Sequence, residues 1–125
     1  MPTRTRVLLV DDHPIVISGI RRLLGFAPDF EVVGQASNAH DAVESAIAAA
    51  PDLILLDLHL PDMAGDEVLE RLLRDPATSD IPVVVLSADA TQDHRAVLVA
   101  AGARAYLTKP IGVRQLLGVI DEHLE

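Results

Sequence analysis

The sequence predicts one α/β domain built on a parallel sheet, and three observations favour it. Apolar runs of four to five residues alternate with segments of helical periodicity, which is typical of repeated βα units. Most of these runs are continuous, as in strands that are buried on both faces. The 125 residues suffice for one core, and Val, Leu, Ile and Ala must build it, because there are only two Phe, one Tyr and no Trp. We therefore expect a single domain over residues 1–125.

Five strand candidates follow one another along the chain. The first, third and fourth are continuous aliphatic runs, whereas the second and fifth are more polar. The candidates are Val7 to Val10, Glu31 to Ala36, Leu53 to Leu56, Pro82 to Leu86 and Arg104 to Leu107.

Helical periodicity lies between and after the strand candidates. Asn38 can cap a helix whose apolar positions follow the i, i+3, i+4, i+7, i+8 pattern, namely Ala39, Ala42, Val43, Ala46 and Ile47. The last segment repeats this pattern with Val113, Leu116, Leu117, Ile120 and Leu124. Each helix should therefore bury one face.

The segments after the third and fourth strands show a weaker helical pattern than the two helices above. Pro76 should end the first of them, whose apolar positions are Val68, Leu69 and Leu72. The segment between Thr91 and Ala101 has a polar front half and no clean apolar stripe. A helix is expected there because strands and helices alternate along the chain.

Composition excludes several classes of function. Nineteen acidic residues against ten Lys and Arg give a net charge of −9, which would repel a nucleic-acid backbone. No cysteine is present, so there is no disulfide framework, which is compatible with a reducing compartment. The start "MPTRTR" leads into the short apolar run "VLLV", which is neither a signal peptide nor a membrane span. We expect a cytoplasmic domain that binds neither membranes nor, by itself, nucleic acid.

Polar residues stand at the carboxyl ends of four of the predicted strands. In an open parallel sheet these ends share one edge, and functional residues gather there. The residues are Asp11 and Asp12 after the first strand, Asp57 after the third, Ser87 after the fourth, and Lys109 with Pro110 after the fifth.

This set of side chains predicts a phosphoryl-transfer site. Three converging carboxylates repel one another unless they hold protons or a cation lies among them. Oxygen ligands with room for water suit Mg²⁺, with Mn²⁺ as a second possibility. A carboxylate beside such an ion can attack a phosphoryl group, while Lys109 and Ser87 can hold the transferred oxygens.

The chain resembles the receiver domain of two-component response regulators from Arg6 to Leu124. The resemblance rests on "VDD", "LLDLHLPDMAG", "VLSA" and "AYLTKP", which form a specific set when they occur in this order. It implies a flavodoxin-like, doubly wound (βα)5 fold with strand order 2-1-3-4-5. It also implies Mg²⁺-dependent transfer of a phosphoryl group from a histidine of a sensor kinase or phosphotransfer protein. Such a domain is not an enzyme on outside substrates and catalyses only its own phosphorylation and dephosphorylation.

The resemblance also implies a role for each matching residue. The acceptor would be Asp57, and the metal ligands would be Asp57, Asp12, Asp11 largely through water, and the backbone carbonyl of His59. The phosphate-binding and switch residues would be Ser87, Lys109 and Tyr106, whose ring turns inward when the Ser87 hydroxyl moves towards the phosphoryl group. The bond before Pro110 would be cis, as in about 5–6% of X-Pro bonds.

Two further residues belong to the predicted site. The side chains of His59 and Asp89 occupy places that, by resemblance, control how fast the phosphoryl group hydrolyses, although either could simply be solvated. The five histidines show no paired ligand spacing, so a zinc site is not expected.

Less specific interpretations exist for each residue alone. Asp11 and Asp12 could cap a helix, Asp57 could belong to a turn, Ser87 could cap the next helix, and Lys109 could be solvated. Two other functions remain: a receiver-like binding module that signals without phosphate, or an aspartyl-phosphate phosphohydrolase. The complete acidic set disfavours the first, and the absence of a second carboxylate in "DLH" disfavours the second.

The resemblance is mixed along the chain. The opening "VLLVDDHPIVISGIRRLL" is similar to receivers fused to a helix-turn-helix output, whereas "LPDMAGDEVL" to "AYLTKPI" is similar to receivers that work with sensor kinases. With its end at Glu125, the chain is either a stand-alone receiver or part of something longer. A homodimer through the fourth helix, fifth strand and fifth helix is plausible by resemblance.

Overall fold

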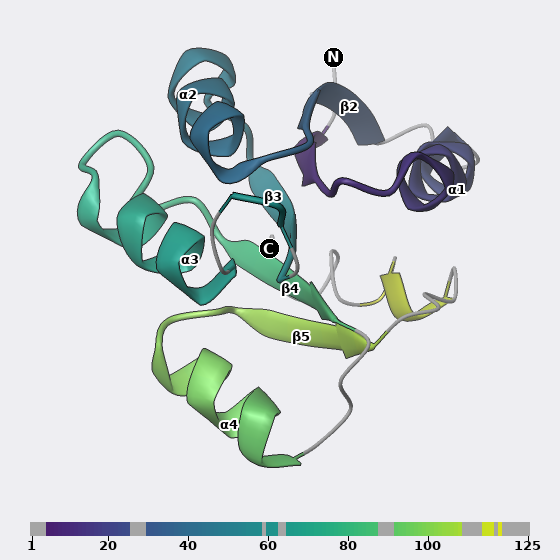
Figure 1. Ribbon diagram of the computed structural model, residues 1–125. Coiled ribbons are helices and arrows are strands. Elements are labelled where there is room, and N and C mark those ends of the chain that lie inside the picture. Colours follow the sequence, from purple (N-terminus) through teal and green to yellow (C-terminus); the bar gives the residue numbers. More distant parts are fainter. Residues whose placement is uncertain are drawn as a thin grey trace.

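The computed structural model describes residues 5–25, 30–58, 60–62, 65–87, 92–108, 114–116 and 118 (Figure 1). Five parallel strands form one sheet in the order β2-β1-β3-β4-β5, which confirms the predicted order. The strands are β1 (Thr5–Val10), β2 (Phe30–Ala36), β3 (Leu53–Asp57), β4 (Val83–Ser87) and β5 (Ala105–Thr108).

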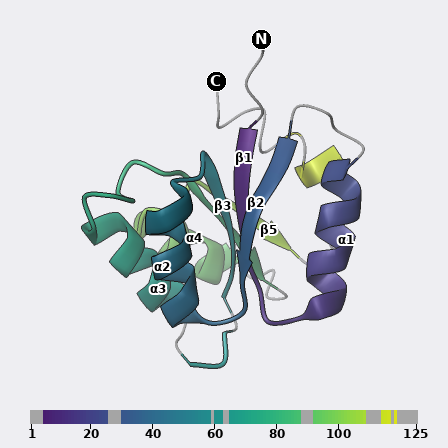
Figure 2. The ribbon, with the colours of Figure 1, turned by 90° about the horizontal axis from the view of Figure 1, so that it is seen from above.

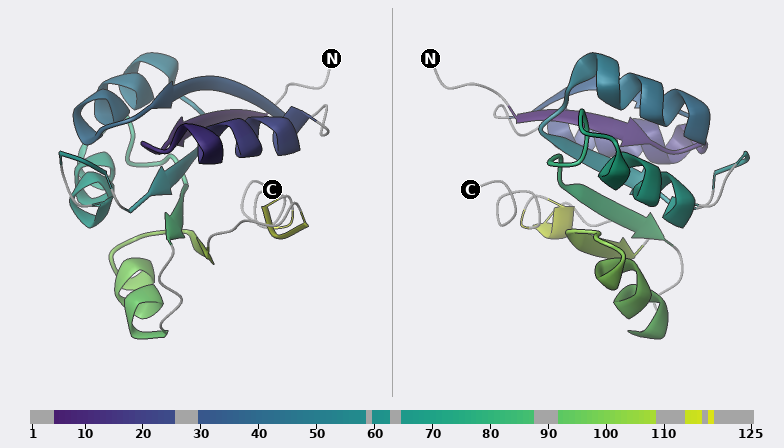
Figure 3. Two further views of the ribbon diagram at one scale, coloured as in Figure 1. Left: turned by 45° about the vertical axis from the view of Figure 1, so that its right-hand side comes forward. Right: turned by 90° about the vertical axis from the view of Figure 1, so that its left-hand side faces the viewer.

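Four helices alternate with these strands in the described part of the chain. They are α1 (Pro14–Gly25), α2 (Ala39–Ala49), α3 (Gly65–Arg74) and α4 (Gln92–Ala100). Three of them, α2, α3 and α4, lie side by side over one face of the sheet, while α1 lies over the other (Figures 2 and 3). Of the predicted last helix, residues 114–116 and 118 are helical, on the side of α1.

Side chains of each central strand point alternately into the two hydrophobic cores, one on each face of the sheet. In β3, Ile54 and Leu56 join the core under α2, α3 and α4, whereas Leu53 and Leu55 join the core under α1. All four side chains are fully buried. This explains why the central strands read as continuous aliphatic runs rather than as alternating patterns. It also fixes β3 rigidly, and β3 ends at Asp57.

The helix predictions agree with the structure in most details. Asn38 caps α2, because its side chain accepts a hydrogen bond from the Asp41 amide at 2.8 Å. Ile47, however, is 45% exposed, so the buried stripe of α2 is narrower than predicted and consists mainly of Ala39, Ala42 and Ala46. In α3 the three predicted core residues Val68, Leu69 and Leu72 are buried, and the helix ends before Pro76.

The strand bounds differ by one or two residues from those predicted. Polar residues such as Thr5 and Thr108 extend the hydrogen-bonded ladder beyond the apolar run, because ladder bonds use the backbone and not the side chain. No helix among the described residues is long and apolar enough to cross a membrane.

Candidate functional site

The strand register brings the predicted acidic residues to one edge of the sheet. Val10 of β1 pairs with Leu56 of β3. The residues that follow them, Asp11 and Asp57, therefore lie next to each other at the carboxyl edge of the sheet. The Asp11 amide donates to the Ala36 carbonyl at 3.0 Å, which holds the end of β1 against the end of β2. The parallel sheet therefore gathers Asp11 and Asp57 although 46 positions separate them in the sequence.

The two carboxylates are almost completely withdrawn from water. Asp57 is 0% exposed and Asp11 is 1% exposed, whereas the Asp12 side chain keeps 32% of its surface exposed. Burial of like charges is unfavourable unless a positive group compensates them. A cation among these carboxylates would compensate them, and we call the group of Asp11, Asp12 and Asp57 the acidic pocket.

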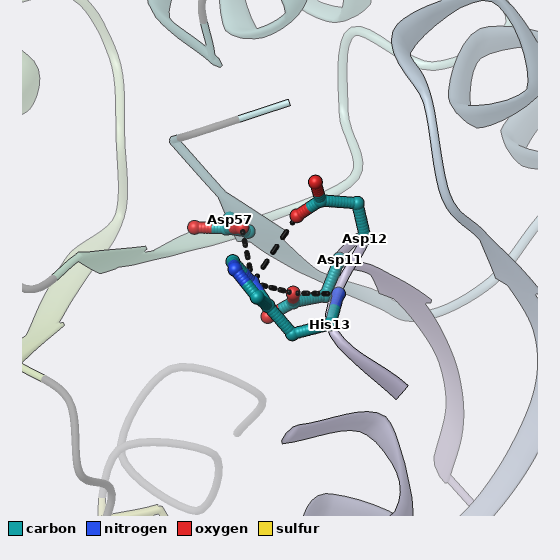
Figure 4. Close-up of side chains that lie close together, drawn as sticks. All are labelled: Asp11, Asp12, His13 and Asp57. Carbon is teal, nitrogen blue, oxygen red and sulfur yellow. Dashed lines mark hydrogen bonds and ion pairs between the residues drawn. The ribbon is translucent and has the colours of Figure 1, made fainter. Parts of the chain in front are cut away.

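A fourth residue, His13, lies against the carboxylates of the acidic pocket (Figure 4). Its Nδ1 lies 3.0 Å from Asp11 Oδ1, 3.1 Å from Asp12 Oδ1 and 3.7 Å from Asp57 Oδ2. Its backbone N–H donates to the same Asp11 oxygen at 2.8 Å. No pattern in the sequence predicted a role for His13; its position directly after the two aspartates is the signal that points to it.

The donor set of the acidic pocket fits a divalent cation. One candidate ligand atom from each of its carboxylates and from His13 lies within 4.8 Å of all the others. The buried Oδ1 of Asp12 accepts no hydrogen bond within the described part of the chain, although His13 Nδ1 lies 3.1 Å away. Carboxylate oxygens at this spacing are the ligands that Mg²⁺ prefers. Asp11, Asp12 and Asp57 could therefore hold Mg²⁺.

Ser87 and Tyr106 occupy neighbouring strands at different depths. Asp57 pairs with Leu86, so the next residue of β4, the fully buried Ser87, lies at the edge that carries the acidic pocket. Tyr106 pairs with Val85 farther inside the sheet, and the residue is 7% exposed in the core on the side of α4. The side chain of Tyr106 is therefore buried in this structure, and its role as a switch residue stays a prediction.

Four predicted site residues lie outside the described residues: His59, Asp89, Lys109 and Pro110. Their proposed roles, including the cis peptide bond before Pro110, stay predictions.

A second group of possible ligands lies on the surface of α2. His40, Asp41 and Glu44 are all exposed, and His40 Nε2 lies 3.5 Å from Glu44 Oε1, one helical turn away. No residue of this group is buried, so water already satisfies its charges. The group therefore lacks the burial that favours a cation in the acidic pocket.

Comparison with known proteins identifies relatives for nearly the whole chain. The family model of the response regulator receiver domain matches residues 7–121. The nitrate/nitrite response regulator protein NarL of Escherichia coli is 39% identical over 116 residues, which are 93% of this chain and 53% of NarL. Response regulator GacA of Pseudomonas aeruginosa is 36% identical over 117 residues, 94% of this chain and 54% of GacA. The chain thus spans about half the length of these curated relatives.

Solved structures are similar over almost the full chain. A LuxR-family two-component response regulator from Aurantimonas sp. superimposes with a TM-score of 0.89 at 30% identity, covering 98% of this chain and 86% of that one. The receiver domain of the sensor histidine kinase PA1611 from Pseudomonas aeruginosa gives a TM-score of 0.86 at 26% identity, with 98% of both chains covered. That structure contains a magnesium ion coordinated in the active site cleft.

Proposed function

The chain belongs to the response regulator receiver domain family, and from this we propose that it accepts a phosphoryl group on Asp57. The observation that carries the proposal is the position of Asp57: its carboxylate ends a fully buried strand and lies among the ligand atoms of Asp11 and Asp12. A buried carboxylate on a rigid strand is held in place for attack on a bound phosphoryl group.

We propose Mg²⁺ as the cofactor, with Mn²⁺ as a possible substitute. The donor set of the acidic pocket supports this, as does the magnesium ion in the related receiver of PA1611. The cation, when bound, would neutralise negative charge that develops on the phosphoryl oxygens. Asp11, Asp12 and Asp57 would hold it, and the backbone carbonyl of His59 is a further proposed ligand.

The chemical step transfers a phosphoryl group between two proteins. A carboxylate oxygen of Asp57 forms a new bond to phosphorus while the bond between phosphorus and the donor's histidine nitrogen breaks. The electron pair of the broken bond stays on that nitrogen. Ser87 at the end of β4 and Lys109 would hydrogen-bond the transferred oxygens. His59 and Asp89 would set the rate at which water later removes the group.

The proposed donor is a phosphohistidine on a sensor histidine kinase or a phosphotransfer protein. Relatives named as response regulators support this class of partner. Because each turnover ends on the domain's own aspartate, the domain would act as a signalling element and not as an enzyme on external substrates. The activity of any longer protein that contains this chain is a separate question, since the match covers about half of each curated relative.

The proposed output is a shift between two populated conformations. A phosphoryl group adds about −1.5 to −2 charges at Asp57, which would draw Ser87 and Lys109 towards it and favour the inward Tyr106 ring. The surface that would respond consists of α4, β5 and the segment after β5. Val97 and Val99 of α4 are 64% and 50% exposed, and such apolar side chains suit a contact with a second copy or another protein.

Acetyl phosphate supplies a test that needs no partner kinase. With Mg²⁺ present, intact-mass spectrometry should detect one added phosphoryl group on the wild type and none on Asp57→Asn. Asp80→Asn is the matched control, because Asp80 is exposed in the turn before β4 and lies outside the acidic pocket. Removal of the metal with EDTA should abolish labelling of both wild type and control.

Other outcomes would identify the alternatives. Equal labelling of wild type and Asp57→Asn would exclude Asp57 as the acceptor. Failure of the wild type to bind either Mg²⁺ or beryllofluoride would indicate a binding module that works without phosphate. Steady, repeated hydrolysis of p-nitrophenyl phosphate would indicate a phosphohydrolase.

A further inference from the structure

The His13 imidazole lies where a metal ligand would lie. Cation-bound oxygen atoms about 2.1 Å from Mg²⁺ and at right angles to one another are about 3.0 Å apart, and opposite ligands are about 4.2 Å apart. Nδ1 of His13 is 3.0 and 3.1 Å from the Asp11 and Asp12 oxygens, and 3.7 Å from Asp57 Oδ2. The separations from the Asp11 and Asp12 oxygens match adjacent corners of one coordination shell, and the separation from Asp57 Oδ2 lies between the adjacent and the opposite values.

We propose that His13 Nδ1 is an additional protein ligand beside the three carboxylates, which makes the acidic pocket a mixed nitrogen and oxygen site. This inference rests on the proposed cation site and adds a statement about which cations it prefers. Carboxylate oxygens suit Mg²⁺, whereas imidazole suits metals such as Co²⁺, Ni²⁺ and Zn²⁺. The nitrogen ligand should therefore raise affinity for these metals much more than affinity for Mg²⁺.

The local chain holds the imidazole in this position. The His13 backbone N–H donates to Asp11 Oδ1 at 2.8 Å, so the backbone and the ring meet the same carboxylate oxygen. Pro14 begins α1 directly afterwards, and its fixed φ suits the first helical position. The His13 side chain is 57% exposed, so only its Nδ1 edge is turned towards the carboxylates (Figure 4). A ring with this exposure can adjust to the shorter bonds that a bound metal requires.

The test compares metal selectivity in the wild type, His13→Ala and His40→Ala. His40 is the matched control, since it lies beside Asp41 and Glu44 in the exposed group on α2. Dissociation constants for Mg²⁺, Co²⁺ and Ni²⁺ are measured by titration calorimetry at one fixed pH, and circular dichroism establishes that each variant is folded. The absorption spectrum of bound Co²⁺ reports directly on its ligands.

His13→Ala should weaken Co²⁺ and Ni²⁺ binding by about tenfold or more, because even removal of a residue that only supports a ligand costs 10–100-fold. Binding of Mg²⁺ should change much less, and the Co²⁺ spectrum should change in His13→Ala but not in His40→Ala. An unchanged ratio of Co²⁺ to Mg²⁺ affinity would overturn the proposal. Tighter binding of every metal by His13→Ala would also overturn it, because the ring would then compete with the cation.

The two proposals can fail separately. If the wild type binds Mg²⁺ and is phosphorylated on Asp57 but His13→Ala keeps the same selectivity, only the ligand role of His13 fails. If the wild type binds none of the three metals, the proposed cation site fails, and the role of His13 fails with it.

Discussion

The Asp62 carboxylate accepts a hydrogen bond of 2.7 Å from the backbone N–H of Ala39, the first residue of α2. Its other oxygen accepts from the His40 N–H at 3.3 Å. Asp62 belongs to the loop that follows Asp57, so this contact ties the loop after the acceptor strand to the start of a neighbouring helix. The free N–H groups at a helix start favour a negative charge. The bond from Ala39 accordingly holds the pKa of Asp62 below the usual range of an aspartate.

The first prediction concerns Asp62→Asn and pH. The folded pKa is lower than the unfolded one, so the carboxylate contributes stability above the unfolded value near 3.8, and this contribution is lost as the pH falls through the folded pKa. In urea unfolding, the wild type should exceed Asp62→Asn in stability at neutral pH, and the gap should shrink below the unfolded value. Asp80→Asn should show no such pH-dependent gap. If the difference in unfolding free energy between the wild type and Asp62→Asn stayed constant with pH, the charge of Asp62 would not contribute to stability.

The second prediction concerns the repulsion between buried carboxylates. Asp57→Asn removes one charge from the acidic pocket but keeps the shape of the side chain, so without metal the variant should be more stable than the wild type by about 1 kcal/mol or more. Added Mg²⁺ should raise the melting temperature of the wild type. At a Mg²⁺ concentration a hundredfold above the dissociation constant, the gain in unfolding free energy is about 2.7 kcal/mol. The variant should gain much less from Mg²⁺. Thermal melts with Mg²⁺ and with EDTA measure both effects, and equal gains in the two proteins would contradict the prediction.

The third prediction concerns Gly102, in the turn between α4 and β5. Its φ of +113° is unfavourable for other residues, and a Cβ there would collide with Leu73 Cδ1 of α3. Gly102→Ala should therefore lose about 1–3 kcal/mol of unfolding free energy. Gly19→Ala is the control: nothing lies within 4 Å of that position in α1, and the change should stabilise the helix by about 0.5–1 kcal/mol. If Gly102→Ala and Gly19→Ala changed the unfolding free energy equally in urea, a side chain at position 102 would cause no strain and the prediction would be wrong.

Local patterns predicted the alternation of strands and helices and the polar residues at the strand ends, because these features depend on residues close in sequence. The strand order and the roles of the site residues came from the resemblance to receiver domains. The aliphatic run before Asp57 indicates a strand buried on both faces, and the strand ends in parallel sheets share one edge, so Asp11 and Asp57 could be placed together in advance.

Long-range and orientational features could not be predicted in this way. The contact between Asp62 and Ala39 joins residues 23 positions apart, and no periodicity marks it. Sequence adjacency placed His13 beside Asp12, but the direction of its ring depends on the turn between β1 and α1. The exposure of Ile47 follows from how α2 is rotated on the sheet, which the apolar pattern alone does not determine.

The last prediction concerns Thr78, a fully buried residue in the turn after α3. A helix would continue with the N–H of residue 76 donating to the Leu72 carbonyl, but that residue is Pro76 and has no N–H. The Thr78 hydroxyl donates to the Leu72 carbonyl instead, at 2.6 Å. Thr78→Val should leave this carbonyl without that donor and lower the unfolding free energy by about 1–3 kcal/mol. Thr78→Ser keeps the hydroxyl and should lose only the smaller contribution of a buried methyl group. Urea unfolding of both variants measures the difference, and a serine variant as unstable as the valine variant would assign the role of Thr78 to its methyl group and not to its hydroxyl.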